Sequence, residues 1–261
     1  MRLNNLGVSE ARINGDFVAA GEYFKQALES QPGCFICRYN LGRSFIATNQ
    51  YSDAHGIFER LVREDPKSAG ALSSLGEVLS LLGDDPGAIP LLEKSLDLDP
   101  NDAITLNNYG ISLHNTQNFK KALKAFDQAI AIQPNMAEAH NYRGITLYQL
   151  GKKKKALKSL RRADSLQPNV AEVKNNLGVV LEKLGKKKQA LSHYLEAVKI
   201  RPNFGNAVFN LALIYIRIGK RDEAQKQLKS LEKFDALLAR ELRKVLWGKY
   251  VVDASAARFK N

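Results

Sequence analysis

The sequence contains two cysteines, Cys34 and Cys37, whose Cys-x-x-Cys spacing is typical of zinc sites and of redox-active dithiols. A structural zinc ion needs four ligands, and no second cysteine pair or nearby histidine exists, so we expect no metal site. A thioredoxin-like motif belongs in a strand–helix–strand setting, which the surrounding sequence does not show. Two interpretations stay open: packing of two small apolar side chains, or a local disulfide in an oxidising compartment.

Other motifs that carry catalysis are missing from the sequence. It has no glycine-rich phosphate loop followed by lysine and serine, no paired-histidine metal motif and no nucleophile elbow. We therefore expect no enzyme activity and no cofactor.

The elements that position these residues are helical hairpins of a fixed length. Residues 171–204 contain two runs of apolar residues at helical spacing, separated by a turn at Gly185, and Pro202 ends the second run. Prolines recur every 34 residues, at Pro32, Pro66, Pro100, Pro134, Pro168 and Pro202. First helices carry a glycine, at Gly42, Gly76, Gly110, Gly144 and Gly178. Second helices carry a bulky partner, at Phe24, Phe58, Leu92, Phe126, Leu160, Tyr194 and Leu228. Because glycine lowers helix stability, its recurrence predicts close helix–helix contact.

This pattern resembles the tetratricopeptide repeat (TPR), a helix-turn-helix unit of the same period. The resemblance rests on Leu41-Gly42, Leu75-Gly76, Tyr109-Gly110 and Leu177-Gly178 and covers residues 1–238. It implies an all-α fold, a right-handed α-solenoid superhelix with units at 1–34, 35–68, 69–102, 103–136, 137–170, 171–204 and 205–238. The first unit departs from the pattern, because Leu6-Gly7 stands one residue early. We also expect a C-terminal capping helix at 235–250, with Trp247 packed near its end, and a short tail at 251–261.

Asparagines recur on the first helices at positions that we expect to be exposed on the inner face of the solenoid. Asparagine is a mediocre helix former, so its recurrence favours a binding role. An amide both donates and accepts, so a ladder of amides can hold the backbone of an extended peptide, with apolar contacts beside it. The predicted partner-binding groove comprises Asn40, Asn107, Asn108, Ile111, Asn141, Tyr142, Ile145, Tyr148, Asn175, Asn176, Val179 and Asn210. The alternative is hydrogen bonding between neighbouring helices.

Two groups of TPR proteins bear on this groove. Similar asparagine ladders line the repeat domain of O-linked N-acetylglucosamine transferases, whose catalytic domain is missing here. Co-chaperones of the family instead grip acidic chaperone tails with a lysine and an asparagine. The position of that lysine falls here on Tyr39, Ser73, Asn107, Asn141, Asn175 and Phe209, so we do not expect the co-chaperone role.

Basic residues concentrate in the second half of the chain. Residues 1–136 hold 12 Lys and Arg against 16 Asp and Glu, and residues 137–261 hold 27 against 11, so the net charges of −4 and +16 sum to +12. Lysines at a helix start oppose the helix dipole by about 0.3 to 1 kcal/mol each, so helix stability does not explain them. They predict a basic edge that attracts an acidic protein, nucleic acid or anionic lipid, or, alternatively, a solvated edge that only aids solubility. The basic edge comprises Lys152, Lys153, Lys154, Lys155, Lys186, Lys187, Lys188, Lys220 and Arg221.

The sequence thus predicts a non-catalytic scaffold that binds a peptide or helix of another protein in its concave groove. The alternative is a basic C-terminal half that binds nucleic acid or an anionic surface, and self-association is a third possibility. No apolar run approaches the roughly 18 residues of a membrane span, so we expect no transmembrane segment. As written, the sequence favours a soluble cytoplasmic protein. An extracytoplasmic location is expected if a leader has been removed and Cys34 and Cys37 are oxidised.

Overall fold

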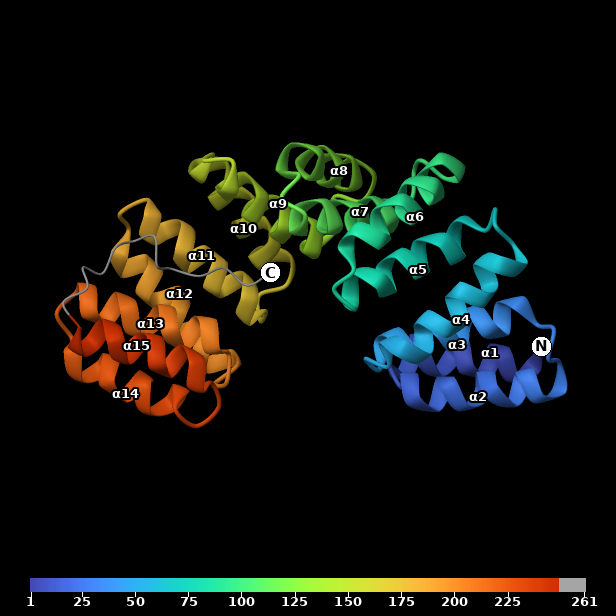
Figure 1. The fold of residues 1–261 in the computed structure, drawn as a ribbon, viewed down its shortest axis with the longest axis horizontal. Coiled ribbons are helices and arrows are strands. Elements are labelled where there is room, and N and C mark those ends of the chain that lie inside the picture. The colour runs from blue at the N-terminus through green and yellow to red at the C-terminus, as the bar shows by residue number, and fades with distance from the viewer. Residues whose placement is uncertain (249–261) are drawn as a thin grey trace. The chain divides into compact units, whose positions relative to one another are not determined.

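The computed structural model describes residues 1–248 and divides into two compact units, Met1–Ile132 and Gln133–Asn261. Both units are stacks of helices (Figure 1), and the described residues contain no strand. The predicted all-α solenoid of helical hairpins is confirmed. Within residues 1–248, no helix is long and apolar enough to cross a membrane.

The helices follow one another with short turns between them. Unit 1 contains α1 (Arg2–Ser9), the π-helix η1 (Glu10–Asn14), α2 (Phe17–Ser30), α3 (Phe35–Ala47), α4 (Tyr51–Glu64), α5 (Ala69–Leu81), α6 (Asp85–Leu98), α7 (Ala103–Asn115) and α8 (Phe119–Ile132). Unit 2 contains α9 (Ala137–Gln149), α10 (Lys153–Leu166), α11 (Ala171–Lys183), α12 (Lys187–Ile200), α13 (Gly205–Arg217), α14 (Arg221–Leu231) and α15 (Ala236–Trp247). The prediction of seven 34-residue units stays our proposal for how these hairpins are grouped.

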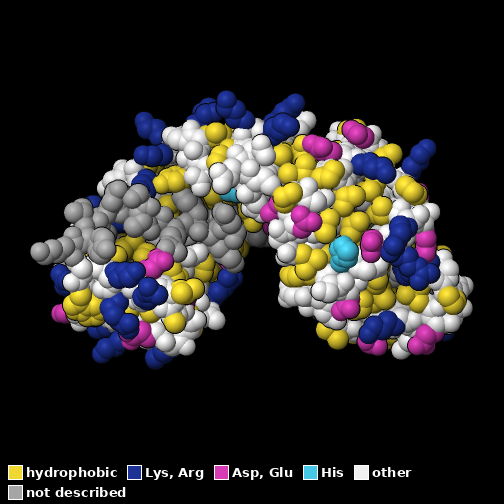
Figure 2. Space-filling model, viewed as in Figure 1, with side chains coloured by type: hydrophobic (Ala, Val, Ile, Leu, Met, Phe, Trp, Pro, Cys, Tyr) yellow, Lys and Arg dark blue, Asp and Glu magenta, His cyan; other side chains and the backbone are white. Residues whose placement is uncertain are grey.

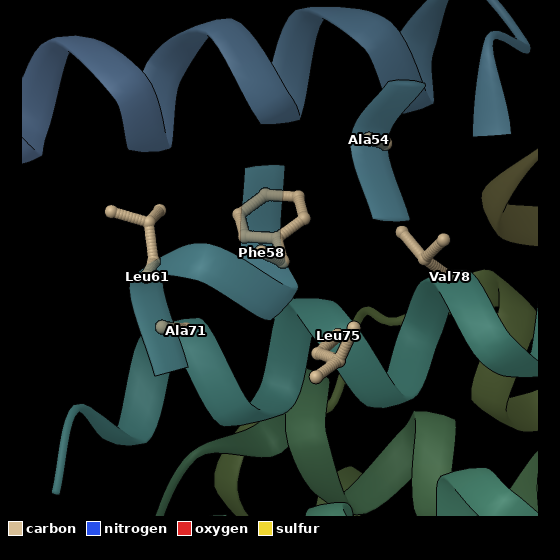
Figure 3. Close-up of a cluster of buried hydrophobic side chains, with 6 residues drawn as sticks. All are labelled: Ala54, Phe58, Leu61, Ala71, Leu75 and Val78. Carbon is tan, nitrogen blue, oxygen red and sulfur yellow. The ribbon is translucent and has the colours of Figure 1, made fainter. Parts of the chain in front are cut away.

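Each first helix packs against the second helix that follows it, and that second helix packs against the next first helix. Second helices end two residues before a repeated proline, as α4 does at Glu64 before Pro66. Figure 3 shows the result between α4 and α5, where apolar side chains of both helices meet in one buried cluster. Its members are Ala54, Phe58, Leu61, Ala71, Leu75 and Val78. The core of each unit is therefore built where consecutive hairpins meet.

The glycines of the first helices lie against the bulky residues of the second helices. A Cβ atom added at Gly110 would lie 2.6 Å from Cε1 of Phe126, and one at Gly144 would lie 2.6 Å from Cγ of Leu160. Real Cβ atoms essentially never come this close to another heavy atom. The prediction that these glycines mark close helix–helix contact is confirmed.

The turn inside each hairpin contains a residue with positive φ, again at the repeat interval. Glycine occupies this position at Gly15, Gly83, Gly151, Gly185 and Gly219. Asn49, with φ of 60°, and Gln117, with φ of 63°, occupy it in the remaining two hairpins. Asparagine tolerates the left-handed region better than glutamine does, so Gln117 is the strained member of the series.

Replacing Gln117 with glycine is expected to stabilise unit 1 by about 0.5 to 1 kcal/mol, because the left-handed conformation costs an L-residue about 1 to 2 kcal/mol and glycine regains part of this only at an entropic cost. The measurement is the shift in thermal midpoint of the full chain. Gly83→Gln is the matched control, and it should lower the midpoint. A lower midpoint for Gln117→Gly would contradict the account.

The early Leu6-Gly7 has a local structural cause. Residues Glu10–Asn14 form a π-helix, in which each turn holds one residue more than in an α-helix. The extra residue is absorbed there, and Gly7 still lies against Phe24, with an ideal Cβ 2.6 Å from its Cε1.

Helix α15 covers α13 and α14 at the C-terminal end of the described residues. The carboxylate of Asp235 caps it by accepting the Leu238 N–H at 2.9 Å, and Leu238, Leu242 and Leu246 are buried. The expectation that Trp247 packs is wrong, because its side chain lies on the outer face of the helix and is 61% exposed. The predicted tail at 251–261 lies outside the described residues.

Cys34 and Cys37 form a disulfide at the start of α3. The interpretation of the pair as two small packed side chains is therefore wrong, and the alternative of a local disulfide is confirmed. The first turn of the helix brings the two Cα atoms to 5.3 Å, which is within the range a disulfide requires.

Candidate partner-binding site

Most asparagines of the first helices pair with one another across neighbouring hairpins. Asn40 donates to Oδ1 of Asn4 at 2.9 Å. Asn176 donates to Oδ1 of Asn141 at 3.1 Å, and Asn210 donates to Oδ1 of Asn175 at 2.8 Å. The partners are 35 residues apart in unit 2 and 36 in unit 1, where the π-helix adds one residue. The repeat period therefore brings two amides together at each of these steps.

The expectation that all of these side chains are exposed is wrong. In the full-length chain, Asn175, Asn176 and Asn210 are 0% exposed and Asn107 is 2% exposed. Ile145 and Val179 are likewise buried. Neighbouring first helices lie close enough for amide to bond amide, and this pairing satisfies the groups that burial removes from water. The alternative of hydrogen bonding between helices is confirmed for Asn40, Asn141, Asn175, Asn176 and Asn210.

The remaining predicted groove residues, Asn108, Ile111, Tyr142 and Tyr148, are partly exposed, as are Asn40 and Asn141. Asn108 shows why the pairing is incomplete. The position 35 residues before it is Ser73, whose hydroxyl accepts the hydrogen bond of Thr105 at 2.6 Å. The amide nitrogen of Asn108 makes no hydrogen bond to any described residue.

A pocket of about 290 Å³ opens between α9 and α11 in unit 2 and contains two predicted groove residues. Asn141 and Tyr142 line it together with Ala137, Glu138, Gln167, Val170, Glu172 and Val173. Oδ1 of Asn141 is engaged by Asn176, whereas its amide nitrogen has no partner among residues 1–248. Val170 and Val173 supply apolar surface beside that donor. The pocket therefore combines an amide donor, an aromatic ring and aliphatic walls, which suits a peptide segment.

A smaller pocket of about 180 Å³ lies in unit 1 and contains a third predicted residue, Asn40. Val8, Ala11, Arg12, Phe17, Phe24, Arg43 and Ser44 complete its lining. Because the amide nitrogen of Asn40 already bonds Asn4, this pocket offers mainly apolar contact.

Burial shifts the pKa of two titratable groups on α9. It raises the pKa of Tyr148, and the carboxylate of Glu182 raises it further, so the phenol stays protonated at neutral pH. It lowers the pKa of His140, and the hydrogen bond to the Pro134 carbonyl opposes this only partly. Both groups are therefore neutral near pH 7, and neither is set up for acid–base chemistry.

The predicted basic edge lies at the starts of α10, α12 and α14. Lys152, Lys186 and Lys220 are the N-cap residues of these helices, and all nine predicted residues are exposed. Within the described part of the chain, none of the lysines forms an ion pair, while Arg221 donates to the Leu246 carbonyl. Figure 2 shows many basic and few acidic side chains on the visible face of unit 2.

Sequence reasoning missed the pocket residues outside the asparagine register, namely Gln167, Val170, Val173 and the carboxylates Glu138 and Glu172. A signal was present, because Glu138 and Glu172 are 34 residues apart and hold the same position in consecutive units. Side chains at equal positions lie next to each other when repeats stack. Glu172 also pairs with Arg201, with 2.5 Å between its Oε1 and Nη1 of the arginine.

Comparison with protein families gives three matches. A model described as a tetratricopeptide repeat matches residues 39–103, and a second with the same description matches residues 91–124. The model of the N-terminal TPR repeat region of Psidin matches residues 112–236. Together they run without a gap from residue 39 to residue 236. The comparison with curated proteins finds no match.

Solved structures of similar fold include the APC/C hetero-tetramer Cut9–Hcn1, at 17% identity and a TM-score of 0.82 over 92% of this chain. This chain spans 48% of the length of that one. MamA is 27% identical, with a TM-score of 0.54 over 66% of this chain and 95% of its own. YrrB, described as a TPR protein with an unusual peptide-binding site, is 24% identical, with a TM-score of 0.55 over 72% of this chain and 97% of its own.

Proposed function

The chain belongs to the tetratricopeptide repeat family, whose repeats generally form non-catalytic interaction scaffolds, and from this we propose that it binds a peptide or helix of a partner protein. The proposed site is the α9–α11 pocket, with Asn141 and Tyr142 as its central contacts. The observation that carries the proposal is the free amide nitrogen of Asn141, which points to an acceptor that the described residues do not supply.

The energetics of such a site are set by a few contacts. One amide hydrogen bond contributes about 0.5 to 1.5 kcal/mol net, and a central tyrosine in an interface contributes about 2 kcal/mol or more. Aliphatic residues beside them exclude water from the contact. Two positions therefore account for roughly 100-fold in affinity, since each 1.4 kcal/mol is a factor of ten.

The test uses a partner captured from lysate and then purified, with binding to the full chain measured by calorimetry. Asn141→Asp keeps the oxygen that Asn176 needs and removes the amide donor, while Tyr142→Ala removes the ring. The double variant is expected to bind roughly 100-fold more weakly. Asn203→Ala, an exposed amide in a turn, is the matched control and should bind like the wild type. Unchanged affinity of the double variant would refute the pocket as the site.

A second candidate function rests on the basic edge, whose lysines are exposed and have no ion-pair partner among the described residues. We propose it as a docking edge for nucleic acid or another anionic surface. Binding there should weaken steeply as salt rises, because it releases counterions. Replacing Lys152, Lys153, Lys154 and Lys155 with glutamine should flatten the salt dependence, whereas a salt slope equal to that of the wild type would contradict the proposal.

A further inference from the structure

The disulfide between Cys34 and Cys37 is a local bridge within one helix turn. Both cysteines belong to the start of α3, so the bridge joins no two hairpins. In the chain-entropy description, a disulfide stabilises a fold less when it closes a shorter loop, and here the two cysteines are only three residues apart. Stapling the fold together is therefore a minor use of this bond.

The two sulfur atoms differ in their access to solvent. Cys37 is 0% exposed, whereas Cys34 is partly exposed. The residues before Cys34 are open: Gln31, Pro32 and Gly33 are exposed, and no atom lies within 4 Å of a Cβ built on Gly33. A thiolate arriving from solution therefore reaches the sulfur of Cys34 and not that of Cys37.

The start of α3 stabilises negative charge on the sulfur of Cys34. Cys34 is the N-cap residue, and its Sγ accepts the backbone N–H of Cys37 at 3.3 Å. The positive end of the dipole of this 13-residue helix lies at the same place, and the first turn contains no acidic residue. The nearest guanidinium, that of Arg38, is paired with Glu64, so its charge is largely offset. A helix N-terminus with a Cys-x-x-Cys pair is an environment that favours a reactive thiolate.

We propose that Cys34 and Cys37 form a redox-active pair that undergoes thiol–disulfide exchange with a low-molecular-weight thiol or a protein dithiol. The external thiolate attacks Sγ of Cys34, which forms a mixed disulfide and breaks the bond to Sγ of Cys37. The electron pair leaves on Cys37, which takes up a proton. A second thiolate then attacks the external sulfur of the mixed disulfide, which releases the external disulfide and leaves the Cys34 thiolate. The protein gains two electrons and the two external thiols lose them.

The reverse sequence reoxidises the pair, with Cys34 as the attacking thiolate on an external disulfide and Cys37 as the resolving thiol. The asymmetry in exposure assigns these roles, because only the accessible sulfur can take part in the intermolecular bond. This site lies in unit 1 and is independent of the pocket proposed above.

The test is a glutathione redox titration of the folded full-length protein, with free thiols trapped by N-ethylmaleimide and counted by intact mass. We expect both thiols to appear together as reduced glutathione rises. Oxidised glutathione should then form an adduct on Cys34 in Cys37→Ser at least ten-fold faster than on Cys37 in the matched Cys34→Ser. A bridge that resists glutathione until denaturant is added, or equal adduct rates in the two variants, would overturn the proposal.

A second measurement needs no variant. The reduced wild-type protein is treated with a limiting amount of iodoacetamide across a pH series, and the alkylated peptide is identified by mass spectrometry. Cys34 should be modified first, and at a lower pH than an ordinary cysteine. Preferential modification of Cys37, or reaction only at the pH of an ordinary thiol, counts against the assigned roles.

Discussion

Replacing Phe58 with alanine is expected to lower the local unfolding free energy around α4 and α5 by about 3 to 5 kcal/mol, the range for a buried phenylalanine. The ring is 0% exposed and packs against Leu61, Leu75 and Val78 (Figure 3). It also makes an edge contact with Tyr39, at a centroid separation of 5.6 Å. Its removal leaves a cavity where two hairpins meet, so the loss includes both transfer and packing terms.

Hydrogen exchange is the appropriate measurement, because a repeat array opens in parts and a single melting transition averages over them. Amides of α4 and α5 should lose protection, while those of α11 and α12 in unit 2 should be unchanged. Phe17→Ala, at a phenylalanine that is 40% exposed, is the control and should cost at most about 1 kcal/mol. Equal losses for Phe58→Ala and Phe17→Ala would contradict the assigned core.

Replacing Gly42 with alanine is expected to destabilise the same hairpin by about 2 kcal/mol, although alanine favours a helix more than glycine does by about 1 kcal/mol. The new Cβ would lie 2.7 Å from Cζ of Phe58 and 3.1 Å from Cγ2 of Ile57. A rigid ring and a branched side chain leave little room to relax. Hydrogen exchange or thermal unfolding of the full chain measures the effect.

Gly56→Ala is the matched control for this substitution. Gly56 lies in α4 of the same hairpin, and no atom comes within 4 Å of its ideal Cβ. Helix propensity alone then acts, and the variant should be more stable by about 1 kcal/mol. In a Phe58→Ala background the clash is gone, so Gly42→Ala should change sign and become stabilising. A loss of stability in that background would show that the ring is not the cause.

The repeat register made much of this fold predictable. Gly110 and Phe126 were paired from spacing alone, because a period of 34 residues reports which side chains stack. The starts and ends of the helices followed from the prolines and turn residues, whose backbone restrictions act locally.

The site was less predictable, because a register gives the face of a helix and not the neighbour that meets a side chain there. Asn175 and Asn210 were expected to be exposed, yet each amide finds the other at 2.8 Å. The exposure of Trp247 and the bridge between Cys34 and Cys37 likewise depend on contacts that spacing does not report.

The account's central claim is that a partner lies against the first helices of unit 2, at the α9–α11 pocket. Photo-crosslinking tests it most directly, with benzoylphenylalanine placed either at position 142 in the pocket or at position 154 on the basic edge. The captured complex is irradiated, and the adduct is mapped by mass spectrometry. We predict a crosslink to the partner from position 142 and none from position 154. A crosslink from position 154 alone would contradict the claim and move the binding site to the basic edge.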